Sequence, residues 1–219
     1  MMVSFLKNPL YLITDRRLSG LSHSQMVRQA IAAGIRTIQL REKQMSKKEL
    51  YREALFLRSL ILKHNTTFIV NDYIDIALAI GADGVHLGQD DMPVEEARKI
   101  MGKKKIIGMS THSLKQAVRA QEAGADYIGF GPVFPTSTKD AGLPKGLKAL
   151  KEIRKHVRIP VVAIGGITAE NILSALESGA DAAAVMSAIL KGDIKENTGR
   201  FLSAIGGQFI KELNIKEGR

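Results

Sequence analysis

Polar and charged side chains cluster in short segments that each come directly after an apolar run. The segments are Gln39-Leu40-Arg41-Glu42-Lys43, Asn71-Asp72, Gly88-Gln89-Asp90-Asp91, Ser110-Thr111-His112, Gly131 to Lys139 with Thr136, Ser137 and Thr138, Gly165-Gly166-Ile167, and Ser187 after Met186. If the apolar runs are parallel strands of one barrel, the segments that follow them converge on one mouth, where such folds carry their chemistry. We therefore expect the functional residues in these segments.

Two carboxylates in these segments suit a divalent cation. Asp72 and Asp91 follow adjacent predicted strands, and Mg²⁺ is usually held by one or two carboxylates together with substrate phosphates. The alternative is helix capping, for which Asp is well suited. Capping is a serious rival for Asp91, which comes just before Met92-Pro93, and Asp90 could exchange roles with it. The Asp72–Asp91 pair predicts one Mg²⁺ per subunit.

Three cations come from two of the segments. Arg41, Lys43 and Lys139 suit a pyrophosphate group, because its several negative charges need forked or point-charge donors. Glu42 is expected to turn outward and pair with a neighbour. The cations predict a substrate that carries a diphosphate.

A second anion site is predicted where barrels commonly bind phosphate, after the seventh and eighth strands. Gly165-Gly166 and Ser187 occupy these places. The alternative for the glycine pair is that it only permits a tight turn.

The sequence leaves the role of one histidine, His112, undecided. His112 could act in acid–base chemistry or have a capping or surface role. His23, His64 and His156 fall on predicted helices or their ends and are expected at the surface, and His86 is expected to pack inside a strand. No two histidines have metal-ligand spacing, so we expect no zinc site.

These segments are positioned by short apolar runs that alternate with longer segments of helical periodicity, which is typical of βα units. The predicted strands are Leu10–Thr14, Thr37–Leu40, Thr67–Val70, Gly84–Leu87, Ile106–Met109, Tyr127–Phe130, Val161–Ile164 and Ala182–Met186. The predicted helices include Lys47–Lys63, Val94–Met101, Leu114–Glu122, Gly146–His156, Ala169–Glu177 and Thr198–Leu213.

A short sequence pattern around a glycine recurs before several predicted strands. Ala33-Gly34-Ile35, Ile80-Gly81-Ala82-Asp83, Ala123-Gly124-Ala125-Asp126 and Ser178-Gly179-Ala180-Asp181 each come just before a predicted strand. Glycine is favoured where a helix ends in a left-handed conformation, so the recurrence of this pattern indicates repeated βα units.

Such units could form a closed barrel or an open doubly wound sheet. No Gly-x-Gly-x-x-Gly follows the first strand, as a dinucleotide-binding sheet would require, so the barrel is favoured. The expected fold class is α/β, a single (β/α)8 TIM barrel with parallel strands. Residues 1–219 are expected to form one domain, with 1–9 as an N-terminal extension and 214–219 as a C-terminal tail.

Composition narrows the class of protein. A chain of 219 residues with 45% apolar residues suits one domain, and the lack of cysteine excludes disulfides and thiolate catalysis. The apolar run from Leu10 to Ile13 is followed directly by the polar segment Thr14-Asp15-Arg16-Arg17. This apolar run is therefore too short for the core of a signal peptide or for a membrane span. We expect a cytoplasmic protein with no membrane partner.

The net charge of +10 fits either nucleic acid or an anionic substrate. No nucleic-acid-binding motif accompanies the charge, and the one compact basic run, Lys103-Lys104-Lys105, is assigned to a solvated loop. We therefore expect small phosphorylated substrates as partners and no nucleic acid. The oligomeric state stays open, a homo-oligomer included.

Taken in order from about Tyr11 to Ile189, the segments resemble the thiamine phosphate synthase family. The resemblance implies a transferase of thiamine biosynthesis that joins 4-amino-2-methyl-5-pyrimidinylmethyl diphosphate to 4-methyl-5-(2-phosphoethyl)thiazole, or to its carboxylated form, and releases pyrophosphate. It implies that Asp72 and Asp91 hold Mg²⁺. The implied residues for the pyrimidine diphosphate are Gln39, Leu40, Arg41, Glu42, Lys43, Asn71, Ser110 and Lys139, and those for the thiazole phosphate are Thr136, Ser137, Thr138, Gly166, Met186 and Ser187.

The implied chemistry needs no strong protein nucleophile. The C–O bond to pyrophosphate breaks first, the aminopyrimidine stabilises the methylene cation, and the thiazole nitrogen captures it. The protein has to neutralise the leaving group and align two substrates, and the catalytic residues implied for this are Arg41, Lys43, Ser110 and Lys139.

A sister family, the thiazole tautomerases, provides the alternative function. Its members transfer a proton on the thiazole and carry a histidine that matches His112. The retained carboxylates Asp72 and Asp91 and the full Gln39–Lys43 segment favour the synthase. Two departures from the usual synthase pattern, Asp140 after Lys139 and Lys148, concern the loop after the sixth strand.

Overall fold

The computed structural model describes residue 6, residues 8–136 and residues 142–217, with residues 207–217 described as backbone alone. The strands form one closed barrel in which each pairs in parallel with its sequence neighbours and β1 pairs with β8. This confirms the predicted fold class. The strands are β1 (Leu10–Ile13), β2 (Thr37–Leu40), β3 (Thr67–Asn71), β4 (Gly84–Leu87), β5 (Ile106–Thr111), β6 (Tyr127–Phe130), β7 (Val161–Ile164) and β8 (Ala182–Val185).

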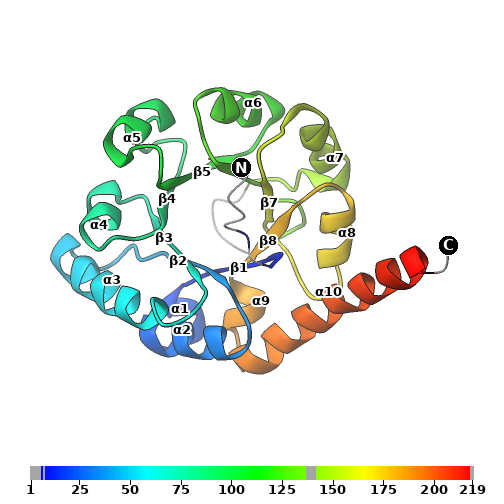
Figure 1. The fold of residues 1–219 in the computed structure, drawn as a ribbon, viewed down its shortest axis with the longest axis horizontal. Helices are drawn as coiled ribbons and strands as arrows, with labels where there is room; N and C mark the ends of the chain where they lie inside the picture. The colour runs from blue at the N-terminus through cyan, green and yellow to red at the C-terminus, as the bar shows by residue number, and fades with distance from the viewer. Residues whose placement is uncertain (1–5, 7, 137–141, 218–219) are drawn as a thin grey trace.

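The helices surround the barrel as an outer ring (Figure 1). They are α1 (Arg16–Ser19), α2 (His23–Ala32), α3 (Lys47–Ile61), α4 (Ile74–Ala79), α5 (Val94–Met101), α6 (Leu114–Glu122), α7 (Gly146–His156), α8 (Ile172–Glu177), α9 (Ser187–Leu190) and α10 (Ile194–Glu217).

Several element boundaries differ from the prediction. The ends of β1, β3, β8 and α3 differ by one or two residues, and three further elements differ for the reasons that follow. β5 continues through Ser110 and Thr111, because these residues still pair with Gly129 and Phe130 of β6. Helix α8 begins later than predicted, since the side chain of Asn171 accepts a hydrogen bond from the Thr168 amide and holds a turn there. Helix α10 begins earlier, at Ile194.

Strand residues alternate between two apolar layers. Leu10 and Leu12 of β1 face the large core between sheet and helices, whereas Tyr11 and Ile13 belong to a smaller cluster inside the barrel. The period of two along a strand produces this alternation. The inner cluster also contains Tyr127.

An aspartate with an arginine joins neighbouring units at three places. Asp83, Asp126 and Asp181 each come just before a strand and accept a backbone hydrogen bond from the preceding strand, from Phe68, Ile107 and Val161. Each also forms an ion pair with an arginine of the helix that precedes the first of the two strands, namely Arg58 of α3, Arg98 of α5 and Arg154 of α7. The aspartates of the repeated segments therefore tie strand to strand and helix to strand.

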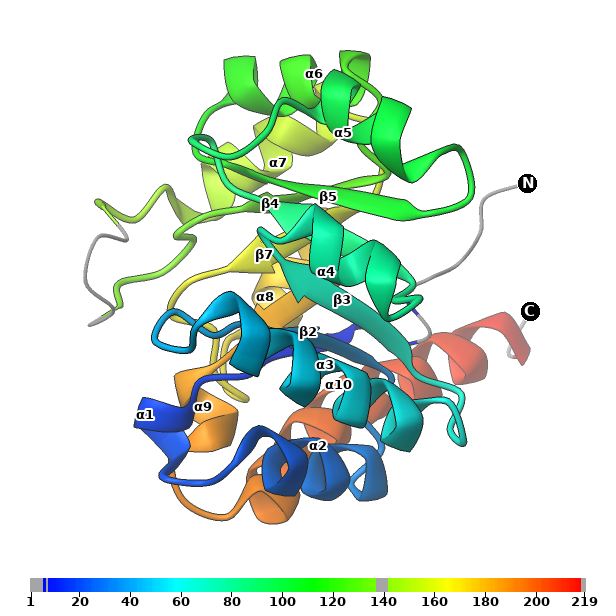
Figure 2. The same ribbon diagram turned by 90° about the vertical axis from the view of Figure 1, so that its left-hand side faces the viewer.

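The C-terminal helix α10 packs across the outside of the ring against α2, α8 and α9 (Figure 2). Phe201 and Ile205 of α10 are buried in the large core. The contact between α10 and α2 therefore joins the last helix to the first part of the helical layer. The pairing of β1 with β8 joins the two ends of the sheet in the same way. In the part of the chain that the structure describes, no helix combines the length and apolar character needed to cross a membrane.

Candidate active site

Asp72 and Asp91 lie together at the carboxyl ends of β3 and β4. Their side chains are within hydrogen-bonding reach of each other, and the Lys43 Nζ atom contacts Asp72 Oδ2 at 2.5 Å. The Gly88 amide donates to Asp91 Oδ2 at 2.6 Å. One lysine and two carboxylates thus share a small volume at the mouth of the barrel.

Asp72 is under opposing electrostatic influences. Burial raises its pKa, the neighbouring Asp91 carboxylate raises it further, and the hydrogen bond from Lys43 opposes them, so that the net pKa lies above its ordinary value. Its backbone also has a φ of +64°, an uncommon conformation that Asp tolerates better than most residues. Two carboxylates held this close repel each other unless a cation or a proton lies between them.

The two carboxylates fit a magnesium ion. No group of three or more His, Cys, Asp or Glu ligands occurs among the residues that the structure describes, so the protein ligands described at this place are the two carboxylates. Mg²⁺ usually takes one or two carboxylates and completes its shell with water and substrate phosphates. The donor set of Asp72 and Asp91 therefore suits Mg²⁺ that is shared with a diphosphate.

The capping alternative for these two residues is wrong. Helix α5 begins after Pro93 and helix α4 after Tyr73, and neither has a side-chain capping bond. Asp90, which could have exchanged roles with Asp91, is exposed to solvent. Asp91 therefore faces Asp72, and capping does not explain either carboxylate.

Arg41 is fixed at the mouth by residues that follow β1. Its backbone amide donates to Thr14 Oγ1 at 3.2 Å, and its Nη1 atom lies 3.4 Å from Asp15 Oδ2. Asp15 also caps α1 by accepting from the amides of Arg17 and Leu18. The Arg41 side chain is 29% exposed, so it remains available to an anionic ligand.

The surface position expected for His23 is wrong, because His23 is fully buried. Its Nε2 atom lies 3.2 Å from Glu42 Oε2, and Arg16 lies 3.8 Å from the same carboxylate. Burial lowers the pKa of His23 despite Glu42 nearby, so at neutral pH the contact is a hydrogen bond between His23 and a charged Glu42. The pairing of Glu42 with a neighbour was expected, but the expected outward position is wrong, because the Glu42 side chain is only 7% exposed.

Two residues of the predicted diphosphate segment point their side chains elsewhere. The Glu42 carboxylate accepts from the Gln44 amide as well as contacting His23, and Leu40 is buried in the core between sheet and helices. Any contact of Leu40 with a ligand at the mouth would therefore come from its backbone.

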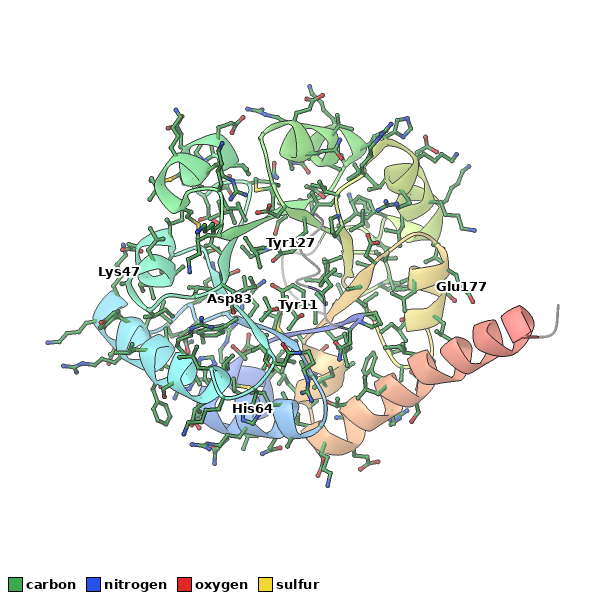
Figure 3. The ribbon with its side chains drawn as sticks, in the orientation of Figure 1. Tyr11, Lys47, His64, Asp83, Tyr127 and Glu177 are labelled. Atoms are coloured by element: carbon green, nitrogen blue, oxygen red, sulfur yellow. The ribbon has the colours of Figure 1, made fainter. Side chains whose placement is uncertain are left out.

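A column of hydrogen-bonded polar side chains crosses the interior of the barrel. Gln39 Nε2 donates to the Tyr11 hydroxyl at 2.9 Å, and the hydroxyls of Tyr11 and Tyr127 lie 2.9 Å apart. The Tyr127 hydroxyl lies 2.9 Å from His86 Nδ1, and His86 Nε2 lies 2.8 Å from Ser110 Oγ. Figure 3 shows Tyr11 and Tyr127 within the ring of strands.

Burial keeps this column neutral. Burial raises the pKa of Tyr11 to about 12 and moves that of Tyr127 well above its ordinary value. Burial likewise lowers the pKa of His86 to about 4, against a smaller opposing effect of Asp91. His86 was expected to pack inside the strand, and it does so with both ring nitrogens hydrogen-bonded.

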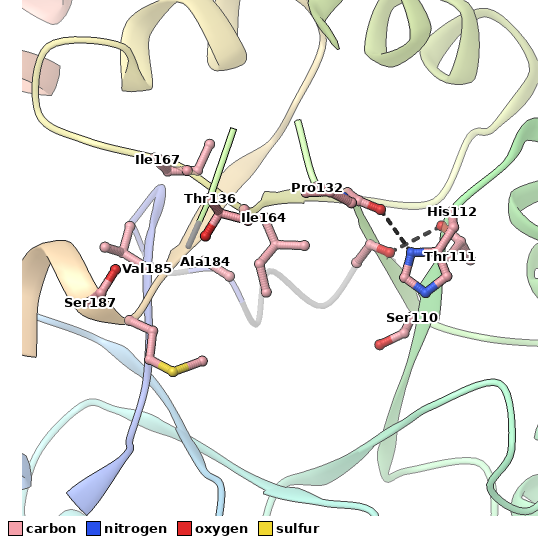
Figure 4. Close-up of a pocket in the computed structure, with 15 residues that line it drawn as sticks. Ser110, Thr111, His112, Pro132, Thr136, Ile164, Ile167, Ala184, Val185 and Ser187 are labelled. Carbon is pink, nitrogen blue, oxygen red and sulfur yellow. Dashed lines mark hydrogen bonds between the residues drawn. The ribbon is translucent and has the colours of Figure 1, made fainter. Parts of the chain in front are cut away.

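A cavity of about 180 Å³ opens beside Ser110 and extends to the ends of β7 and β8. Its walls include backbone and side chains from the loops after β5, β6, β7 and β8 (Figure 4). Among the predicted site residues, those that line it are Ser110, Thr136, Gly166, Met186 and Ser187. Ser110 thus belongs both to this cavity and to the polar column.

The glycine pair after β7 lines the cavity, and close packing of the neighbouring loop also requires glycine at these two positions. Gly165 and Gly166 have φ values of +91° and +66°, which side chains rarely adopt. A Cβ at Gly166 would lie 2.3 Å from the Pro135 carbonyl oxygen. The pair therefore permits the tight turn and lets the loop after β6 approach, so the turn alternative and the ligand interpretation are compatible.

His112 lines the same cavity and is held by two hydrogen bonds. Its Nδ1 donates to the Gly131 carbonyl oxygen at 2.8 Å, and its amide donates to Gln116 Oε1 at 2.7 Å. A neutral His112 therefore carries its proton on Nδ1.

Three predicted site residues, Ser137, Thr138 and Lys139, lie outside the described residues, and their roles stay predictions. Asn71 ends β3 and pairs in register with His86, which places it beside the carboxylate pair.

Sequence reasoning missed Tyr11, Tyr127, His23 and Asp15. Alternation along the strands indicates that Tyr11 and Tyr127 share the barrel interior, but their contact depends on how strands far apart in sequence are staggered. His23 precedes Ser24 and Gln25 in a polar stretch, so local hydropathy gives no signal of its burial.

Comparison with known proteins agrees with this geometry. The family model described as thiamine monophosphate synthase matches residues 10–189. Thiamine-phosphate synthases from Clostridium novyi (strain NT) and Persephonella marina are each 50% identical to the chain, over 90% and 87% of it and 97% and 92% of their own lengths. The solved structure of thiamine phosphate pyrophosphorylase from Pyrococcus furiosus superposes with a TM-score of 0.85 at 42% identity, covering 93% of this chain and 98% of that one.

Proposed function

The chain belongs to the thiamine monophosphate synthase family, and on that premise we propose that it condenses 4-amino-2-methyl-5-pyrimidinylmethyl diphosphate with 4-methyl-5-(2-phosphoethyl)thiazole to give thiamine phosphate and pyrophosphate. The carboxylated thiazole can replace this second substrate in the proposal, and its carboxylate then leaves as CO₂. None of the compared proteins favours the thiazole tautomerase alternative. The cytoplasmic location and the single-domain organisation stay predictions, as does the oligomeric state.

One observation carries the proposal at the level of residues. The carboxylates of Asp72 and Asp91 meet beside Lys43, and the cavity beside Ser110 extends to the ends of β7 and β8. This arrangement supports a diphosphate and its cation at one end and a phosphorylated acceptor at the other.

At the diphosphate end, we assign Asp72 and Asp91 to Mg²⁺ and Gln39, Arg41, Lys43, Asn71 and Ser110 to the pyrimidine diphosphate, with Lys139 as a further cation. Bound Mg²⁺ would supply positive charge to the departing pyrophosphate oxygens. Arg41 supplies two forked donors and Lys43 a point charge, and both groups are placed before the charge develops. Preorganised donors of this kind lower the barrier more than groups that must be ordered during the reaction.

At the acceptor end, we assign the thiazole phosphate to Thr136, Gly166, Met186 and Ser187, together with Ser137 and Thr138. The walls of the cavity beside Ser110 support this assignment, because they bring the first four together around one volume. The C–O bond of the diphosphate breaks and its electron pair leaves with pyrophosphate. The thiazole nitrogen then donates its lone pair to the methylene carbon, so the protein's task is to align the two substrates.

The test is formation of thiamine phosphate from both substrates, with Mg²⁺ and with EDTA. Product that appears with Mg²⁺ and disappears with EDTA supports the reaction and the carboxylate site together. Product that persists in EDTA would contradict the metal assignment. A folded protein that forms no product under either condition would contradict the proposed reaction.

A further inference from the structure

We propose that Tyr11, Tyr127 and His86 are positioning residues that fix which hydrogen-bonding group Gln39 and Ser110 present to the pyrimidine diphosphate. The inference rests on the proposed function, because it takes Gln39 and Ser110 as ligands of that substrate. The column through the barrel acts as a directional relay from one ligand residue to the other.

The column is continuous, and the tyrosines at its centre are closed off from solvent. Four hydrogen bonds of 2.8 to 2.9 Å connect Gln39, Tyr11, Tyr127, His86 and Ser110 in that order. Tyr11 and Tyr127 keep 1% and 0% of their surface exposed. Because the two tyrosines are buried, bulk water does not compete for the hydrogen bond between their hydroxyls.

The Gln39 end sets a direction. The Gln39 amide donates to Tyr11, which leaves the single proton of the Tyr11 hydroxyl to go onward to Tyr127. The Tyr127 proton then goes to His86 Nδ1. A neutral imidazole that accepts at one nitrogen donates at the other, so His86 Nε2 donates to Ser110 Oγ.

With the hydrogen bonds running from Gln39 to Ser110, these two residues are suited to bind different parts of one substrate. Ser110 accepts from His86 and therefore keeps its own proton for an outside acceptor, which fits an anionic diphosphate oxygen. Gln39 uses its amide nitrogen inside the column and keeps its carbonyl oxygen for an outside donor, which fits the exocyclic amino group of an aminopyrimidine. The opposite direction would present the Ser110 lone pairs to an anion and the Gln39 amide to an amino group.

Two glycines leave room for the rings of the column. A Cβ at Gly108 would lie 2.1 Å from the Tyr127 ring, and one at Gly129 would lie 3.2 Å from the His86 ring. Strands β5 and β6 therefore carry no side chain at the positions where Tyr127 and His86 pack. Close packing holds the two rings in place before substrate arrives, as a positioning role requires.

The first test replaces single hydroxyls in the column. Tyr127→Phe removes the middle hydroxyl and Tyr11→Phe the one beside Gln39, and neither tyrosine is among the residues that line the cavity assigned to the thiazole phosphate. We expect each to raise KM for the pyrimidine diphosphate about tenfold, which corresponds to the net value of roughly one hydrogen bond, with KM for the thiazole phosphate unchanged. Circular dichroism and Tm identify a variant that does not fold, in which case the other one decides.

The second test uses a matched pair at His86. In His86→Gln the amide nitrogen reaches the place of Nε2 and can still donate to Ser110, whereas in His86→Asn it reaches only the place of Nδ1. We expect His86→Gln to keep the wild-type KM for the pyrimidine diphosphate within about threefold and His86→Asn to raise it as Tyr127→Phe does.

The outcomes separate this inference from the proposed function. Equal changes in both KM values, or no change in either from folded Tyr variants, would overturn the relay while an active wild-type enzyme upholds the reaction. Equal behaviour of His86→Gln and His86→Asn would also overturn it. A wild-type protein without synthase activity would instead overturn the proposed function itself.

Discussion

At the scale of single residues, Asp72 has the environment of a ligand rather than that of a structural carboxylate. A structural carboxylate is usually satisfied by donors, and its pKa then falls. Asp72 has one donor in Lys43 and a second carboxylate in Asp91, and its pKa is raised by burial and by that neighbour. The cluster therefore keeps an electrostatic strain that a divalent cation would relieve.

Asp72→Asn and Asp91→Asn each remove one negative charge from this pair. We expect either substitution to lower synthase kcat/KM by about 100- to 1,000-fold, comparable to the loss of one preorganised group at a transition state, and to raise the Mg²⁺ concentration needed for half-maximal rate. Steady-state kinetics over a Mg²⁺ titration measures both effects.

Asp90→Asn is the matched control, because Asp90 is exposed and adjacent in sequence. Its Mg²⁺ requirement should equal that of the wild type. A large loss in Asp90→Asn with near-normal Asp91→Asn would reverse the assignment of the two residues.

His86 makes stability depend on pH. Burial lowers its pKa from 6.5 to about 4, so between these values the unfolded chain binds more protons than the folded one. The free energy of unfolding therefore decreases as pH falls through this window. We expect the His86 contribution to fall by about 2 kcal/mol between pH 7 and pH 5, and urea unfolding at the two pH values measures the change.

The comparison for that experiment is His86→Gln, whose side chain does not titrate. Other groups contribute to the pH dependence of both proteins, so the difference between them isolates His86. If wild type and His86→Gln lost equal stability from pH 7 to pH 5, the imidazole would not be kept neutral by its burial.

At the scale of elements, the three Asp–Arg pairs explain how helices are registered on the sheet. In each case one carboxylate accepts a hydrogen bond from a strand amide and pairs with an arginine of the helix that precedes that strand. The two strands and the helix before the first of them are thus joined by side chains at the amino-terminal end of the barrel, opposite the candidate active site. Barrels commonly separate stability and catalysis between their two ends in this way.

Asp126→Ala should therefore destabilise the fold without changing catalysis. The substitution leaves the Ile107 amide and Arg98 without their shared partner, and hydrogen bonds to charged groups contribute about 1.5–3 kcal/mol. We expect a loss of unfolding free energy in that range, measured by urea unfolding, with both KM values unchanged at 25 °C.

Glu122→Ala provides the control in the same stretch of chain, because Glu122 is exposed at the end of α6. Its effect should stay within about 0.5 kcal/mol. A wild-type unfolding midpoint in Asp126→Ala would contradict a connecting role for the aspartate.

At the scale of the whole molecule, the order of strands and helices could be predicted because it depends on local patterns. Apolar runs such as Val161–Ile164 and the recurring glycines before strands mark each βα unit. The carboxylate pair was also predictable, since adjacent parallel strands bring their following residues together.

The polar column could not be predicted in the same way. Tyr11 and Tyr127 are 116 residues apart and lie on β1 and β6, and their contact depends on barrel closure and stagger, which no local pattern encodes. The aspartates of the repeats were visible, but the sequence alone did not connect them to Arg58, Arg98 and Arg154. Ser110 was expected in a loop and lies in β5, because strand length depends on the partner strand.

A substitution at Phe201 tests how strongly the C-terminal helix α10 stabilises the barrel. This α10 side chain is 2% exposed and lies in the core between sheet and helices. We expect Phe201→Ala to cost about 3–5 kcal/mol of stability by leaving a cavity, with one cooperative transition in urea. The exposed Ser203→Ala is the control, and separate transitions in Phe201→Ala would show that α10 unfolds independently of the barrel.

The closed sheet also has a consequence for solubility under stress. An open sheet offers the backbone of its outermost strands to other chains, which is a common start of aggregation. Here β1 pairs with β8, so the folded barrel presents no such template. Aggregation on heating should therefore begin only after the β1–β8 seam has separated, and its rate should follow the rate of unfolding rather than the concentration of the native protein.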